Sequence, residues 1–191
     1  MSLRDIAPVL ALLGTLAACR SAGSGPYEPT TEVARNTVLA QELSSKAADL
    51  IDSDPEAAEI LLRQALTADL FFGPAHNNLG VLYIGKGKLY EAAGEFEWAR
   101  KLMPGHPDPR MNLALTLERA GRTDEAIQTY KTALEVFPGH VPTEQALARL
   151  YVRSGAKPEE LDGLLETIAM QGETQEWRSW ARAEMARARN E

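Results

Sequence analysis

Few residues of this chain have the types and spacing that catalysis or metal binding requires. Its three histidines are the first candidates. His106 and His140 each follow Pro-Gly in two similar segments, but neither has a second ligand four residues along a helix, as zinc sites often have. We interpret both as loop residues, and His76 as a packing residue at the start of a helix. The sequence therefore predicts no metal site and no cofactor.

A glycine-rich stretch and scattered carboxylates complete the search for catalytic groups. Gly85-Lys86-Gly87-Lys88 lacks the spacing of a phosphate-binding loop and has no Ser or Thr after the lysine, so we interpret it as a turn between helices. The acidic residues fall on predicted exposed helix faces. We therefore expect neither an enzyme nor a small-molecule substrate. A chain of net charge −7 without a basic stripe is not expected to bind nucleic acid.

Cys19 is the one cysteine of the chain and cannot form an internal disulfide. It follows a Leu-Ala-Ala triplet and the apolar stretch 6–18, which as a helix would cover about 20 Å, less than the roughly 30 Å of a bilayer core. This segment resembles a bacterial lipobox. The resemblance implies that residues 1–18 form a lipoprotein signal peptide and that the sulfur of Cys19 carries a diacylglycerol. The alternatives are an ordinary cleaved signal peptide or an incidental buried cysteine.

Residues 19–29 are small, polar and proline-bearing, which predicts a flexible tether after the lipidated cysteine. Arg20 rather than Asp follows that cysteine. By resemblance to sorted bacterial lipoproteins, this implies a lipid anchor in the outer membrane with the folded part facing the periplasm. Two or more fatty chains on one residue give stable anchoring, whereas a single chain is marginal.

A repeated pattern organises the rest of the chain. Residues 74–104 and 108–138 match at an offset of 34, with large residues recurring where space between helices must be filled. Small residues recur where two helix backbones cross, and glycine and proline recur at helix ends. The matched pairs are Leu79 and Leu113, Gly80 and Ala114, Tyr83 and Leu117, Gly87 and Gly121, Ala92 and Ala126, Phe96 and Tyr130, Ala99 and Ala133, and Pro104 and Pro138.

This pattern resembles the tetratricopeptide repeat (TPR) family, although His76 and Arg110 stand where that family usually has Trp. The resemblance implies an all-α fold, a right-handed superhelical solenoid of antiparallel helix hairpins with a C-terminal capping helix. We expect about four repeats over residues 30–171 and the capping helix over residues 172–191.

The repeats at both ends fit the pattern less well and should pack more loosely. The offset of 34 places Ser45 in an inward position of the first repeat and Glu160 in an inward position of the last. Outside the central repeats we expect helices at Thr30–Ile51 with Thr30 or Thr31 as N-cap, at Pro55–Leu70 with Asp54 as N-cap, and at Thr174–Arg189.

Aromatic residues at two junctions have two interpretations each. Phe71-Phe72 either plugs the junction between the first two repeats or forms a patch for a partner. Trp177 and Trp180 either seal the end of the array or anchor a partner. We favour packing in both cases.

The TPR resemblance also implies a site, because in this family the first helix of each repeat lines a concave groove that holds peptides or helices. Asn78 and Asn112 are stacked equivalents whose amides either bind a ligand's backbone or satisfy neighbouring helices. The lysine pair that clamps a free C-terminus in chaperone-binding relatives is missing, since Pro74 and Asp108 occur where basic residues would help. The predicted lining is Asn77, Asn78, Val81, Ile84, Met111, Asn112, Leu115, Arg119, Gln145, Arg149 and Arg153.

These features together predict a lipid-anchored periplasmic TPR scaffold that binds a protein or peptide partner in its groove. The layout is similar to that of small lipoproteins that assist the assembly of pili and secretion channels, which implies a role of that kind. The alternative is an adaptor that recruits or regulates a periplasmic hydrolase or cell-wall enzyme.

Overall fold

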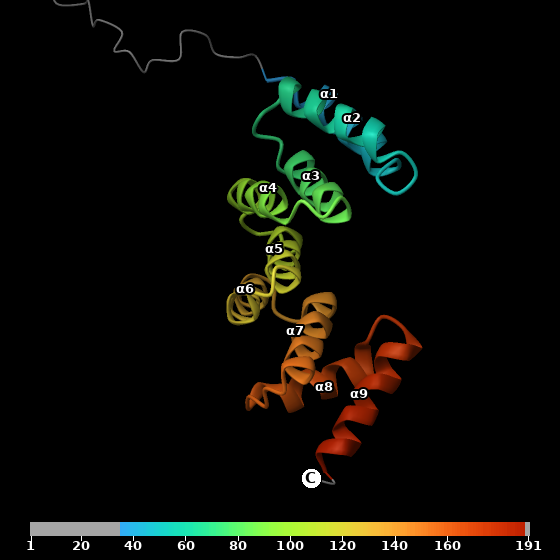
Figure 1. Ribbon diagram of the computed structural model, residues 1–191, viewed down its shortest axis with the longest axis vertical. Helices are drawn as coiled ribbons and strands as arrows, with labels where there is room; N and C mark the ends of the chain where they lie inside the picture. Colours follow the sequence, from blue (N-terminus) through green and yellow to red (C-terminus); the bar gives the residue numbers. More distant parts are fainter. Residues whose placement is uncertain (1–34, 190–191) are drawn as a thin grey trace, which may run out of the picture. The chain divides into compact units, whose positions relative to one another are not determined.

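The computed structural model describes residues 35–189, which belong to a compact unit that begins at Arg35. The described residues contain nine helices and no strand (Figure 1), which confirms the all-α prediction. The signal peptide, Cys19 and the tether lie outside the described residues. The helices are α1 (Thr37–Ala48), α2 (Pro55–Ala68), α3 (Gly73–Gly85), α4 (Leu89–Leu102), α5 (Asp108–Arg119), α6 (Thr123–Val136), α7 (Val141–Ser154), α8 (Glu160–Gln171) and α9 (Gln175–Ala188).

Consecutive helices form four hairpins, α1–α2, α3–α4, α5–α6 and α7–α8, and α9 packs on α8. The first helices of neighbouring hairpins also touch, α1 against α3 and α3 against α5. Contacts between elements that are close in sequence are what a stacked repeat array requires. In Figure 1, α3, α5 and α7 follow one another in one row, and α4 and α6 in another. Between residues 35 and 189, no helix is both long and apolar enough to cross a bilayer.

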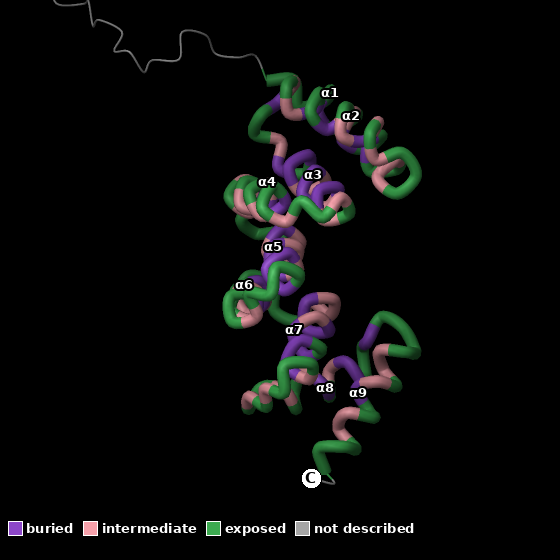
Figure 2. Tube along the Cα trace, viewed as in Figure 1, coloured by how far each residue is buried: buried purple, intermediate pink, exposed green. Residues whose placement is uncertain are grey.

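The central repeats depend on one close approach between helices. Phe96 of α4 is fully buried, and its ring covers Gly80 of α3 so closely that an added Cβ would lie 2.6 Å from the ring's Cε1. The matched place in the next repeat holds Ala114 against a core that contains Tyr130, and both are fully buried. Figure 2 shows that buried residues gather on α3, α5 and α7. A single main apolar cluster extends from α1 to α7.

Glycine and proline end the helices as the repeat predicts. Gly87 follows the C-cap of α3 with φ of 71°, and Gly121 follows that of α5 with φ of 77°. This left-handed backbone closes a helix at low cost only for glycine. α4 ends at Leu102, two residues before Pro104, which cannot donate a helical hydrogen bond.

The first described helix ends earlier than predicted. α1 spans Thr37–Ala48, whereas the predicted helix continued to Ile51, and its N-cap is Asn36, whose side chain accepts a hydrogen bond from the backbone N–H of Leu39 at 3.1 Å. The predicted N-caps Thr30 and Thr31 lie outside the described residues. An Asn at this place satisfies one of the unpaired N–H groups of the first turn. α2, by contrast, has the predicted cap, Asp54.

One helix of each terminal hairpin, α1 in the first and α8 in the last, is shifted by one residue from the pattern of the central hairpins, whereas α2 and α7 keep that pattern. In α1, Ser44 is buried and Ser45 is exposed. In α8, Leu165 and Ile168 are buried, whereas Glu160 is exposed. One residue turns a helix by about 100°, so the shift removes a carboxylate from the interior and replaces it with leucine and isoleucine. The inward positions predicted for Ser45 and Glu160 were therefore wrong.

Candidate partner-binding groove

The predicted groove lies on the first helices of the hairpins, on the side not covered by the second helices. α3 and α5 contact one another directly, so their side chains form one surface. Val81, Ile84 and Met111 pack partly against the main core and are partly open to solvent. The half-buried members of the predicted lining are Asn77, Asn78, Val81, Ile84, Met111, Asn112 and Leu115.

Amide side chains link the first helices of successive repeats. The Nδ2 of Asn78 donates to the Oγ of Ser44 at 3.2 Å, and the Nδ2 of Asn112 donates to the Oδ1 of Asn77 at 3.1 Å. Both asparagines therefore bind a neighbouring helix, as the second of the two interpretations expects. An asparagine amide has two N–H groups and a carbonyl oxygen, so these bonds leave groups on the same half-buried side chains for a ligand.

A buried carboxylate connects the groove ends of α5 and α7. The Oε1 of Glu118 lies 2.9 Å from an Arg153 nitrogen and 3.6 Å from an Arg149 nitrogen, while its Oε2 accepts from the hydroxyl of Tyr130 at 3.1 Å. Burial and the adjacent Glu118 charge raise the pKa of the Tyr130 hydroxyl. Arg119, the next predicted lining residue, is exposed and makes no ion pair within residues 35–189. This end of the groove thus presents two guanidinium groups beside one carboxylate, and Arg119, the residue after Glu118, adds a third exposed guanidinium on α5.

Gln145 does not line the groove. Only 2% of it is exposed. With its amide oriented to satisfy both groups, its nitrogen donates to the Oε2 of Glu173 at 3.2 Å and its oxygen accepts from the Glu173 N–H at 3.0 Å. The turn between α8 and α9 therefore covers this position, which repeat matching could not indicate because that turn lies outside the repeats.

The two tryptophans of α9 pack at the end of the array, as favoured, and partner anchoring by them stays a prediction. They form an edge-to-face pair with ring centroids 5.4 Å apart and pack on the small apolar cluster that joins α7, α8 and α9. Both are half-buried, and they border an open pocket of about 410 Å³. The pocket is lined by Arg149, Thr174, Glu176, Trp177 and Trp180. Sequence reasoning placed Arg149 in the groove but missed that the capping helix extends it.

His76 is a packing residue, as predicted. It is 5% exposed, its Nδ1 lies 2.7 Å from Glu95 and its Nε2 lies 2.9 Å from the carbonyl oxygen of Leu70. Its ring stacks on Trp98 of α4 with centroids 5.9 Å apart. The histidine therefore joins the turn before α3 to α4.

The other two histidines meet at one carboxylate. Asp108 lies 3.6 Å from the Nδ1 of His106 and 3.9 Å from the Nε2 of His140. His140 also contacts the hydroxyl of Thr143 at 2.7 Å. Within the described part of the chain, no group of three His, Cys, Asp or Glu side chains is arranged to hold a metal ion.

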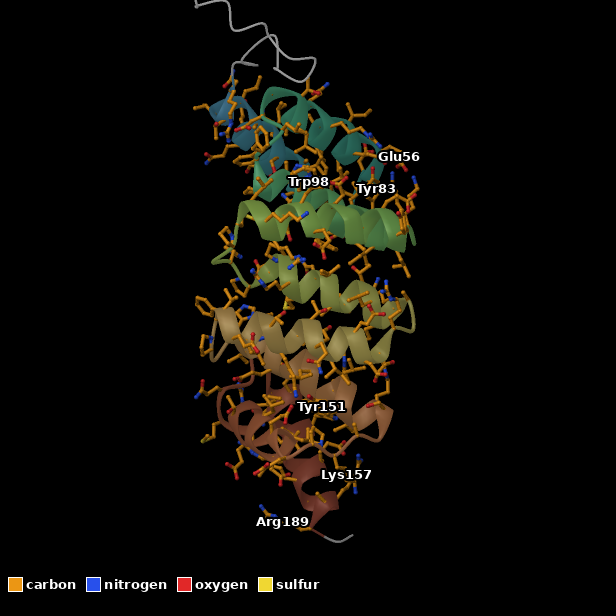
Figure 3. All side chains as sticks on the ribbon, turned by 90° about the vertical axis from the view of Figure 1, so that its left-hand side faces the viewer. Glu56, Tyr83, Trp98, Tyr151, Lys157 and Arg189 are labelled. Atoms are coloured by element: carbon orange, nitrogen blue, oxygen red, sulfur yellow. The ribbon has the colours of Figure 1, made fainter. Side chains whose placement is uncertain are left out.

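The stretch Gly85-Lys86-Gly87-Lys88 forms the turn between α3 and α4, as predicted. Lys86 also forms ion pairs with the preceding hairpin. The Nζ of Lys86 lies 2.8 Å from Glu59 and 3.4 Å from Glu56. The hydrogen bonds from Lys86 and then Arg63 lower the pKa of Glu59 to about 2. Arg63 also donates to the hydroxyl of Tyr83 at 2.9 Å. Figure 3 shows Glu56 and Tyr83 at the edge of this junction.

In the Phe71-Phe72 pair, only Phe72 has the favoured packing role, and a partner patch at Phe71 stays a prediction. Phe72 packs against the main core and plugs the junction between α2 and α3. Phe71 is 50% exposed, and the guanidinium of Arg35 lies over its ring at 5.3 Å.

Comparison with known proteins agrees with this geometry. Residues 77–141 match the family model described as Tetratricopeptide repeat. No curated protein matches the chain.

Similar solved structures share the fold at low sequence identity. The first TPR of Spaghetti (RPAP3), bound to the HSP90 peptide SRMEEVD, is 15% identical with a TM-score of 0.60, and the match covers 65% of this chain and 99% of that one. A crystal structure of MamA is 18% identical with a TM-score of 0.58 over 78% of this chain and 81% of the other. A TPR protein from Parabacteroides merdae ATCC 43184 is 23% identical with a TM-score of 0.63, and the match covers 76% of this chain but only 58% of its longer relative.

At these identities the structures establish the fold alone. Repeat arrays of this kind create extended concave surfaces that bind other molecules. The family match, which begins in α3 and ends at the start of α7, shows that residues 77–141 carry the tetratricopeptide repeat, and the stacked hairpins of the described residues have the fold of these solved TPR structures.

Proposed function

We propose that this protein is a scaffold that binds an extended segment of a partner protein along α3, α5 and α7. The observation that carries the proposal is the row of half-buried side chains on these helices, with Asn78 and Asn112 held in place by Ser44 and Asn77. Fixed amides can bind a peptide backbone without requiring one sequence. The Spaghetti structure, which has a similar fold, contains a bound peptide.

The second part of the proposal concerns where the scaffold acts. A lipid on Cys19 would hold the protein at the periplasmic side of the outer membrane, and the tether over residues 19–29 would let the repeats reach a partner. Confinement to a membrane raises the local concentration of whatever the groove holds. This arrangement suits the assembly of an envelope machine such as a pilus or a secretion channel.

A photo-crosslinking amino acid placed at Leu115 in living cells tests the groove. Leu115 lies next to Asn112 on α5 and is half-buried, whereas Ile60 on α2 is 59% exposed and provides a matched position away from the groove. We expect a specific adduct at Leu115 and none at Ile60. The adduct should be lost when Asn78 and Asn112 are both changed to Ala in a chain that remains helical by circular dichroism. An undiminished adduct in that double variant would remove the groove assignment.

The anchor needs a separate experiment. Cys19→Ser should move the protein from the membrane fraction to the soluble periplasmic fraction, and persistent membrane association of this variant would contradict the lipid assignment. Mass spectrometry of the crosslinked partner then distinguishes the roles. A pilus or secretion component supports the assembly function, whereas a hydrolase supports the adaptor.

A further inference from the structure

We propose that the C-terminal end of the groove selects a partner segment that is acidic and carries an aromatic or large apolar side chain. This inference rests on the proposed scaffold function and deepens it by naming the chemistry of the segment. It is carried by two features that the structure brings together, the arginines of α5 and α7 and the tryptophan-lined pocket of α9.

The arginines expose three cationic side chains at this end of the groove, in a chain whose net charge is −7. The side chains of Arg149 and Arg153 are 45% and 59% exposed, although both approach the same oxygen of Glu118. Glu118 has an exposed side-chain fraction of only 4%, so its charge is turned inward while the guanidinium groups remain open to solvent. Arg119 adds a third exposed cation. Guanidinium groups with open N–H donors bind carboxylates in a bidentate manner.

The pocket beside these arginines suits a neutral side chain. Trp177 and Trp180 present their rings to it, and Arg149 and Thr174 form part of its wall. Its volume of about 410 Å³ falls within the range of roughly 300–1,000 Å³ that is usual for ligand pockets. Glu176, also in the wall, repels a second carboxylate, and hydrogen bonding to Thr174 lowers the pKa of Glu176, which keeps it charged.

Arg149 both pairs with Glu118 and forms part of the pocket wall. Its position therefore sets which residues of the bound segment face the arginines and which one enters the pocket. Carboxylates of the partner lie over Arg119 and Arg153, and an aromatic or large apolar side chain next to them enters the pocket. A lysine-rich segment would place its cations against three arginines, which disfavours it.

Tryptophan fluorescence gives a direct test with synthetic peptides blocked at both ends. The chain has three tryptophans, so Trp98→Phe leaves only Trp177 and Trp180 as reporters. The probes are a Glu-rich peptide with one Phe, the same peptide with Lys for each Glu, and the Glu-rich peptide with Ser for Phe. We expect the first to change the emission and to bind about tenfold or more tightly than either of the others, with an affinity that falls as salt rises.

Arg119→Gln and Arg149→Gln should each weaken binding of the acidic peptide several-fold. Arg122→Gln is the matched control, because Arg122 lies three residues from Arg119 but pairs with Glu125 outside the groove. Arg119 has no ion-pair partner in the described chain, so its variant tests the proposal without loss of fold.

Equal binding of the acidic and basic peptides, or unchanged affinity in both arginine variants, would overturn the inference. If the Leu115 adduct still forms and still depends on Asn78 and Asn112, the scaffold function stands and only the acidic preference fails. If the adduct is absent as well, both fail.

Discussion

Gly80→Ala tests whether the stacking of α3 on α4 depends on the absence of a side chain. The new Cβ would lie 2.6, 2.7 and 2.9 Å from three carbons of the Phe96 ring, which is fully buried and therefore cannot swing into solvent. Overpacking of this kind costs about 1–3 kcal/mol. Ala in place of Gly within a helix returns about 1 kcal/mol, so we expect a net loss of roughly 0–2 kcal/mol in the free energy of unfolding.

Gly94→Ala is the matched control for helix propensity. Gly94 lies in the neighbouring helix α4, and nothing approaches within 4 Å of a Cβ added there. That variant should therefore gain about 1 kcal/mol. The two substitutions are chemically identical, so their difference measures the contact with Phe96. Urea unfolding followed by circular dichroism provides both values.

Combining Gly80→Ala with Phe96→Leu should partly relieve the strain, because the smaller side chain leaves room for the new methyl group. The cost of the pair should then be less than the sum of the two single costs. A Gly80→Ala protein as stable as the Gly94→Ala protein would show that the ring accommodates a methyl group, and the close-approach argument would be wrong.

Three further outcomes follow from charged groups. Burial raises the pKa of Glu144, whose Oε2 has no hydrogen-bond partner among residues 35–189. Its stability contribution is therefore present at low pH and lost as pH rises, so Glu144→Gln should raise stability near neutrality by about 1 kcal/mol, with no gain in thermal melts near pH 4. Lys86→Met should raise the pKa of Glu59 from about 2 toward its ordinary value, as measured by an NMR titration. In that variant the stability that the ionised Glu59 carboxylate contributes should be lost at a higher pH on acidification than in the unchanged protein. Arg153→Met should cost about 2–3 kcal/mol in urea unfolding, since it deprives the buried Glu118 of its nearest cation; an unchanged midpoint would show that Arg149 suffices.

The central repeats could be predicted because each buried position of one hairpin has a matched buried position in the next hairpin. Leu79, Ala92 and Phe96 fill the interior of one hairpin, and their copies fill the next, so matched places in the sequence are matched places in space. The ends could not be predicted by the same rule. α1 and α8 are each turned by one residue relative to the repeat pattern, so that Ser44 is buried in place of Ser45, and Leu165 and Ile168 are buried while Glu160 is exposed.

The groove was predicted only where it follows the repeats. Asn78 and Asn112 lie where the family resemblance implies, but their hydrogen bonds across helices depend on a distance that the sequence does not contain. The burial of Gln145 and the pocket of Trp180 both arise from the chain after α8, which has no matched copy. Contacts between unmatched segments require coordinates.

The division of the apolar interior into two clusters has a consequence for motion. The larger one extends from α1 to α7, whereas the buried members of the small one at the C-terminal end of the described residues are Ala148, Leu165, Ile168, Ala169 and Ala181. Fewer apolar groups make local opening less costly, so backbone amides of α8 and α9 should exchange with deuterium faster than those of α3 to α6. When a partner segment binds the groove, the amides of α9 beside it should open less often and exchange with deuterium more slowly. Slower exchange in α9 would therefore show that the groove is occupied.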